Sequence, residues 1–147
     1  MSVQKTKLAP VRMLLLSVGA GIAAILLALS WPGSAEEAAP PVTEHEFGHG
    51  RLVWTIDAYP AKALRDNAFT VTVTGPDGKP LHGAKLAVNL DMLGMICGDV
   101  DFAMTEVAPG TYAGSGVPLM AGTWKATATL ESGGQTYTVS RLLKAVR

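Results

Sequence analysis

Soft sulfur donors are concentrated in one stretch of this sequence, between Leu90 and Trp124. Four of the six methionines and the only cysteine lie there. Three of these donors follow one another at spacings of three and two residues beside two glycines: Met92, Met95 and Cys97, with Gly94 and Gly98. Glycine lets a short loop turn its side chains toward a common point. Because thioethers and thiolates prefer Cu(I) to hard ions and bind it at low coordination number, this spacing indicates a candidate Cu(I) site.

Two further donors are candidates for the same site. Met120 lies on the predicted loop before Trp124, and His82 lies in the turn before the strand that ends in Met92. Both could approach one end of a β-sandwich, so the predicted metal-ligand set is Met92, Met95, Cys97, Met120 and His82. Met104 shares the alternation of Phe102, which predicts an inward-facing core residue instead of a ligand.

Core packing is the competing explanation for these methionines. Met92 continues the predicted inward face formed by Leu86, Val88 and Leu90, and methionine commonly fills gaps in apolar cores. A single cysteine in an exported protein cannot form an internal disulfide, so Cys97 is expected to be buried, metal-bound or paired with another molecule. Inert packing and a redox or intermolecular thiol therefore stand beside copper binding as alternatives.

A second group of candidate ligands lies in the six residues from Glu44 to His49, where His45 and His49 accompany two glutamates. This composition suits Cu(II) or Zn(II), but a flexible cluster loses conformational entropy when it binds a metal. The alternative is a solvated segment that leads into the first strand.

Charge and motif content exclude several classes of protein. Beyond Ala35 there are nine basic and twelve acidic residues, which disfavours nucleic acid as a partner. No nucleophile elbow, phosphate-cradling glycine loop or paired acid and base is recognisable, so an enzyme is not expected. Asp91, Asp99 and Asp101 lack the alternating oxygen ligands of an EF-hand.

The N-terminal region predicts a membrane segment. Residues from Met13 to Trp31 are uncharged, and at about 1.5 Å per residue a helix of this length spans roughly 28 Å, about the thickness of the hydrocarbon layer. Basic residues precede the segment, so the remainder of the chain is expected to be exported. The small residues Gly33, Ser34 and Ala35 also suit cleavage after Ala35 as a signal peptide, which would release the domain into the periplasm. The expected organisation is a basic cytoplasmic region at 1–12, an anchor or signal segment at 13–32, a flexible linker at 33–48 and a β domain at 49–147.

The remaining sequence has the period of two that is typical of strands. Seven short strands are expected at residues 52–56, 69–74, 84–92, 101–107, 111–117, 123–130 and 136–145. They predict an all-β fold, an immunoglobulin-like antiparallel β-sandwich of about seven strands, preceded by one N-terminal transmembrane or signal helix. Trp124 and Tyr112 are expected to be buried between the two sheets, because large aromatic residues supply much of a small core.

Three motifs resemble the YtkA-like domain family, which also forms the exported part of FixH-type proteins: Gly78–Ala84, Glu106–Tyr112 and Met120–Trp124. The resemblance covers roughly residues 53–146, and the predicted membrane segment fits the FixH arrangement. It implies a small domain in the periplasm or outside the cell, linked to copper handling or to assembly of a copper-containing cytochrome oxidase. The expected function is Cu(I) binding by a membrane-anchored domain that serves such an oxidase or a copper transporter. The alternative is a metal-free interaction module that docks on a membrane complex.

Overall fold

The computed structural model describes residues 40–96 and 98–147, which form one all-β unit. Its nine strands are β1 (Val42–Phe47), β2 (Gly50–Ile56), β3 (Ala61–Lys62), β4 (Asn67–Thr74), β5 (Lys85–Met92), β6 (Val100–Ala108), β7 (Thr111–Gly116), β8 (Gly122–Ser132) and β9 (Gln135–Val146). No helix in these residues is long and apolar enough to cross a membrane. The predicted segment at 13–32 lies outside the described residues.

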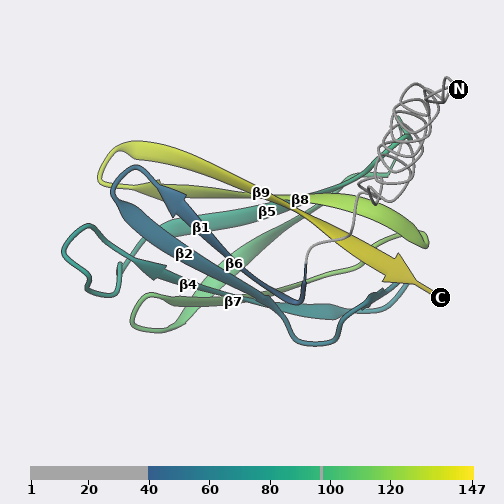
Figure 1. Cartoon of the computed structure of the whole chain (residues 1–147), viewed down its shortest axis with the longest axis horizontal. Helices are drawn as coiled ribbons and strands as arrows, with labels where there is room; N and C mark the ends of the chain where they lie inside the picture. The colour runs from purple at the N-terminus through teal and green to yellow at the C-terminus, as the bar shows by residue number, and fades with distance from the viewer. Residues whose placement is uncertain (1–39, 97) are drawn as a thin grey trace, which may run out of the picture. The chain divides into compact units, whose positions relative to one another are not determined.

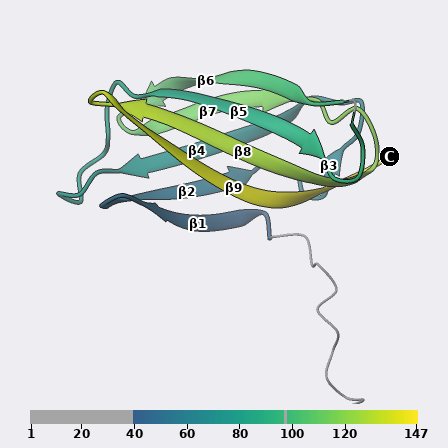
Figure 2. The ribbon, with the colours of Figure 1, turned by 90° about the horizontal axis from the view of Figure 1, so that it is seen from above.

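The strands form one continuous curled sheet in the order β1-β2-β4-β7-β6-β5-β8-β9-β3 (Figures 1 and 2). All pairs are antiparallel except β3 with β9. Strand β6 joins the two halves, because its first part pairs with β5 and its second part pairs with β7. A register shift between Glu106 and Ala108 accompanies this change of partner, and such bulges increase local twist.

Alternating side chains from both halves enclose a single apolar core. Strand β4 is typical: Phe69, Val71 and Val73 are buried, and the residues between them face outward. Trp124 and Tyr112 are completely buried, as predicted. The largest buried side chains come from both halves of the sheet: Trp54, Trp124, Tyr112, Phe69, Leu52, Ile56, Leu86, Leu90, Leu130 and Leu143.

The open side of the curled sheet is bridged by Arg141 on β9. This buried guanidinium donates hydrogen bonds to the carbonyl oxygens of Pro41 (3.3 Å) and Trp54 (3.2 Å), and also to that of Pro40. It lies 6.0 Å from the centre of the Trp54 ring. Burial lowers the pKa of Arg141. The contacts fix the start of β1 to both β2 and β9.

The all-β antiparallel prediction is confirmed, but the number of strands is nine and the sheet is continuous. Each of the seven predicted strands overlaps an observed one. Strand β1 lies within residues 33–48, which were expected to be a linker. Its polar side chains show no apolar alternation in the sequence, and its backbone hydrogen bonds come from pairing with β2. Strand β3 is only two residues long and exists through its pairing with β9.

Candidate metal site

A tight turn holds Met92 and Met95 close together at the end of β5. The Met95 N–H donates to the Met92 carbonyl oxygen at 3.3 Å, and Gly94 between them has a φ of 84°. A positive φ at the third position is typical of a type II turn, whose first and last Cα atoms lie within about 7 Å. Glycine at position 94 therefore allows the methionine spacing of three to form one compact turn.

The loop between β7 and β8 brings Met120 to the same end of the domain. Met92 is the register partner of Trp124, whose indole Nε1 donates to the Met120 carbonyl oxygen at 3.0 Å. A Cβ on Gly122 would lie 2.5 Å from Cε of Met92, so the Met92 side chain packs directly on this loop. Three of the predicted ligands, Met92, Met95 and Met120, thus share one end, which we call the loop end.

Two of these three thioether side chains reach the surface. Met95 is 45% exposed and Met120 is 40% exposed, whereas Met92 is half-buried against the core. Met104, the predicted core methionine, is buried, and its Sδ would lie 2.8 Å from a Cβ on Gly114. The structure therefore separates Met104 from the methionines of the loop end.

Cys97 lies outside the described residues. In the sequence it comes two residues after Met95, the last residue of the turn. Its place in the ligand set stays a prediction.

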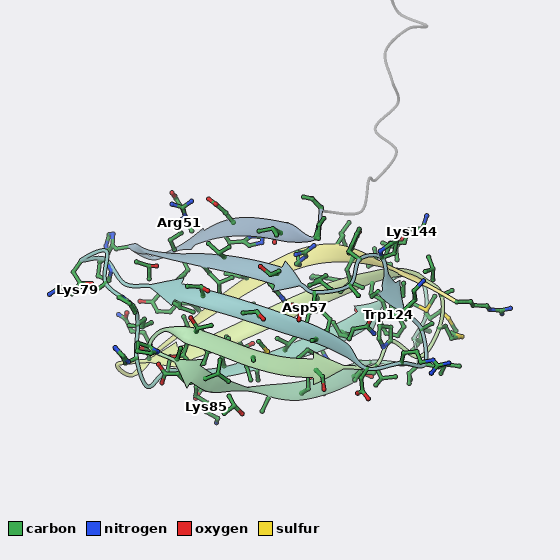
Figure 3. The ribbon with its side chains drawn as sticks, turned by 90° about the horizontal axis from the view of Figure 1, so that it is seen from below. Arg51, Asp57, Lys79, Lys85, Trp124 and Lys144 are labelled. Atoms are coloured by element: carbon green, nitrogen blue, oxygen red, sulfur yellow. The ribbon has the colours of Figure 1, made fainter. Side chains whose placement is uncertain are left out.

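His82 does not share the loop end with the methionines. It lies before Lys85, at the opposite end of β5 from Met92, and the eight residues of this extended strand separate its ends by about 24 Å. Figure 3 shows the neighbouring Lys79 at the opposite end of the domain from Trp124. One copper ion cannot contact both His82 and Met92, which corrects the predicted ligand set. The reason is that the β4–β5 turn and the β5–β6 loop lie at opposite ends of one strand.

His82 instead belongs to a hydrogen-bonded cluster around Glu106. Its Nδ1 lies 3.4 Å from Glu106 Oε1, and the Glu106 carboxylate accepts backbone N–H bonds from Gly110 and Gly83, each at 2.9 Å. Nearby, the Tyr112 hydroxyl donates to the Leu81 carbonyl oxygen at 2.8 Å and accepts from the backbone N–H of Ala84 at 3.0 Å. Two of the motifs that carry the family resemblance, Gly78–Ala84 and Glu106–Tyr112, therefore contact each other here. Their hydrogen bonds link the β4–β5 turn to the β6–β7 turn.

This cluster predicts an acid-sensitive contribution to stability. The N–H bonds from Gly110 and Gly83, the largest cause, lower the pKa of Glu106 below its ordinary value of 4.5. A carboxylate with a lowered folded-state pKa contributes stability above its unfolded-state pKa and loses it as the pH falls through the folded-state pKa. We expect Glu106→Gln to lose this part of the pH dependence in thermal unfolding scans below pH 5.

Glu131→Gln is the matched control for this prediction. Glu131 Oε2 lies 3.7 Å from Lys85 Nζ on the exposed surface, where ion pairs contribute little to stability. The control is expected to keep the wild-type pH dependence. If the unfolding temperatures of wild type and Glu106→Gln fall in parallel as the pH drops below 5, Glu106 does not contribute the predicted acid-sensitive stability.

His45 and His49 do not form a metal cluster with the other described side chains. His45 is half-buried and its Nε2 lies 2.9 Å from Thr43 Oγ1, while His49 lies in the turn between β1 and β2. Burial, followed by the charge of Arg141, lowers the pKa of His45. Within residues 40–96 and 98–147, no three or more His, Asp and Glu side chains gather as a metal site. The strand sends neighbouring side chains to opposite faces, which separates His45 from the adjacent glutamates.

The sequence interpretation missed the apolar residues that surround the loop-end methionines. Leu93, Ile96 and Leu119 are exposed there, and Leu64 from the β3–β4 connection joins them. The available signal was the loss of alternation after Met92, where apolar residues continue past the end of the strand.

These features define a small all-β domain with a continuous curled sheet and a methionine-bearing loop end. The chain belongs to the FixH family, whose sequence profile matches residues 51–144. This membership confirms the resemblance drawn from the three motifs.

Two crystal structures are similar to the chain at low sequence identity. One is the PmoD soluble domain from Methylocystis sp. (Rockwell), with 12% identity, a TM-score of 0.48, and coverage of 76% of this chain and 100% of that chain. The other is an engineered protein from the Northeast Structural Genomics Consortium, with 16% identity, a TM-score of 0.46 and coverage of 75% of this chain. This chain spans 21% of the engineered one. No curated protein is significantly similar in sequence.

Proposed function

We propose that this FixH-family protein is an accessory, non-catalytic membrane protein whose exported domain carries Cu(I) at its loop end. Residues 13–32 anchor the chain in the membrane in this proposal. The partner is a copper-containing respiratory oxidase that receives copper during assembly, or a copper transporter that supplies it. Copper is cargo here, because a carrier must release the ion as well as bind it.

The observation that carries the proposal is the gathering of three methionines from two loops at one end of the domain. The β5–β6 turn supplies Met92 and Met95, and the β7–β8 loop supplies Met120. Exposed thioethers on Met95 and Met120 are accessible to an incoming ion. Uncharged sulfur donors suit Cu(I), which is soft and tolerates few ligands.

Cys97 supplies the fourth donor in this proposal. Its thiolate adds a negative charge to an otherwise neutral set of donors, so it contributes most of the affinity. The methionines then provide specificity for a soft ion. The FixH resemblance supports a link to copper-oxidase assembly, since FixH-type proteins are associated with that process.

The experiment that tests the proposal is an anaerobic competition between the purified chain and a Cu(I) chelator. The triple substitution of Met92, Met95 and Met120 by leucine removes three sulfur atoms and nearly conserves volume. We expect it to weaken Cu(I) binding by at least about tenfold, which corresponds to about 1.4 kcal/mol.

Met104→Leu is the matched control. It replaces a buried methionine outside the loop end and should cost less than about 1.5 kcal/mol of stability, with unchanged copper affinity. Equal Cu(I) affinities of wild type and the triple variant would contradict the methionine site.

A metal-free interaction module is the second candidate function. The observation that favours it is the exposure of Leu93, Ile96 and Leu119 among the methionines, because these side chains carry no donor atom. A wild-type chain that fails to compete with the chelator at all would leave this candidate as the better explanation of the loop end.

A further inference from the structure

Most of the exposed large apolar side chains of the domain lie at the loop end. Among the described residues eight such side chains are exposed, and six of them are Leu64, Leu93, Met95, Ile96, Leu119 and Met120. Ile96 is fully exposed and Leu64 is 71% exposed. Contiguous exposed apolar surface on a small domain marks an interaction site, because its exposure to water is unfavourable.

Backbone hydrogen bonds hold the three contributing loops side by side. The Leu64 N–H donates to the Pro118 carbonyl oxygen at 2.8 Å, which joins the β3–β4 connection to the β7–β8 loop. The Leu93 N–H donates to the Thr123 carbonyl oxygen at 3.1 Å, which joins the β5–β6 loop to β8. These hydrogen bonds therefore hold the six side chains on one surface at the loop end.

Long cationic side chains border this surface. Arg65 and Arg147 line a pocket together with Leu64, Leu119 and Met120. At a bilayer interface, such side chains lay their aliphatic stems along apolar groups and place the charge among the lipid headgroups. Asp66 and Asp99 lie on the same loops, so apolar contact and not net charge has to provide most of the attraction.

The chain enters the domain on the side that carries the loop end. Arg141 binds the carbonyl groups of Pro40 and Pro41, and the Ile56 N–H donates to the Pro41 carbonyl oxygen at 3.0 Å. Ile56 is the last residue of β2 and pairs with Phe69 of β4. Phe69 in turn pairs with Gly114, near the end of β7 that precedes Pro118. The chain thus joins the half of the domain that carries the loop end.

The segment before this point is short. The predicted membrane segment ends at Pro32, and residues 33–39 reach at most about 25 Å when fully extended. Strand β9 alone, with twelve residues, spans about 40 Å. If the predicted segment is a membrane anchor, a tether shorter than the domain keeps the loop end within reach of the bilayer surface.

We propose that the loop end is a membrane-docking surface, whose apolar side chains insert into the lipid interface beside the anchor. Ile96 and Leu64, the two most exposed of these side chains, lie on separate loops and enter the lipid most deeply, and Arg65 and Arg147 lie at the headgroups. Docking goes beyond the copper proposal: it rests on the proposed anchor at residues 13–32 and not on copper binding. It would place the loop-end methionines at the level of the membrane, where a membrane-embedded partner could reach them.

The test is spin-label accessibility in the full chain, reconstituted at one copy per lipid nanodisc of phosphatidylcholine and phosphatidylglycerol. The label is attached through Ile96→Cys in a Cys97→Ser background. Oxygen concentrates in lipid, whereas a polar nickel chelate stays in water. We expect the label at position 96 to collide more with oxygen than with the chelate. Leu64→Cys in the same background provides an independent site on a different loop.

Val107→Cys is the matched control, because Val107 is 63% exposed and lies near the β6–β7 turn at the opposite end of the domain. It should collide more with the nickel chelate. Labels at 96 and 64 that behave like the control would overturn the proposal. Shielding of both labels from both reagents would also overturn it, since protein would then cover the loop end instead of lipid.

Discussion

Trp124→Ala is expected to lower the free energy of unfolding of the domain by about 3 to 5 kcal/mol. Trp124 is completely buried, and its strand pairs with β5 on one side and β9 on the other. Removing the indole leaves a cavity that these paired strands cannot close without breaking their register. Because small domains have only about 5 to 15 kcal/mol of stability, this loss is a large fraction of the total. Urea denaturation followed by circular dichroism measures it.

Trp124→Phe separates packing from hydrogen bonding in this prediction. Phenylalanine keeps an aromatic ring in the core but cannot donate to the Met120 carbonyl oxygen, which accepts from Trp124 Nε1 at 3.0 Å. The hydrogen bond itself is expected to contribute about 0.5 to 1.5 kcal/mol. An alanine variant that unfolds at the wild-type urea midpoint would contradict the central place of Trp124 in the core.

Strands whose inward face is apolar could be predicted from the sequence because side-chain alternation directly reflects burial. Residues 69–74 alternate apolar residues with threonine, and the structure buries Phe69, Val71 and Val73 in β4. The same pattern predicted the inward face of β5 and the burial of Met104. For these elements the hydrophobic effect alone selects the face, so local sequence is sufficient.

Strand β1 could not be predicted in this way, since tertiary contacts stabilise it. Its residues from Val42 to Phe47 include two glutamates and a histidine, and the half-buried face carries Thr43 and His45. Pairing with β2 and the contacts of Arg141 with Pro40 and Pro41 hold it in place. Arg141 is 100 residues away from Pro41 in the sequence, a separation that no local pattern reveals.

The candidate site was only partly predictable for a related reason. The spacing of Met92 and Met95 is local, and a turn through Gly94 follows from it. Which end of the sheet a distant residue reaches depends instead on strand direction and order. Met120 reaches the loop end because β8 pairs with β5, whereas His82 precedes β5 and therefore lies at its other end.

Cys97→Ser is expected to weaken Cu(I) binding more than any single methionine substitution in the loop end. A thiolate is the one anionic donor of the proposed set, and its loss should cost well over tenfold in affinity, or more than about 1.4 kcal/mol. The variant should also lose the pH dependence of binding. Protons compete with Cu(I) for the thiolate, so wild-type affinity falls as the pH drops, by up to about tenfold per pH unit. Methionine thioethers take up no proton in this range.

Met95→Leu is the matched comparison for this prediction, because it removes a neutral sulfur donor from the same loop. It should weaken Cu(I) binding less than Cys97→Ser and leave the slope of affinity against pH in place. Anaerobic chelator competition at several pH values measures both quantities for each variant. If wild type and Cys97→Ser compete equally at every pH, the thiolate takes no part in binding. A pH slope that survives Cys97→Ser would then assign the proton-linked ligand to another residue, and Cys97 would be removed from the proposed ligand set.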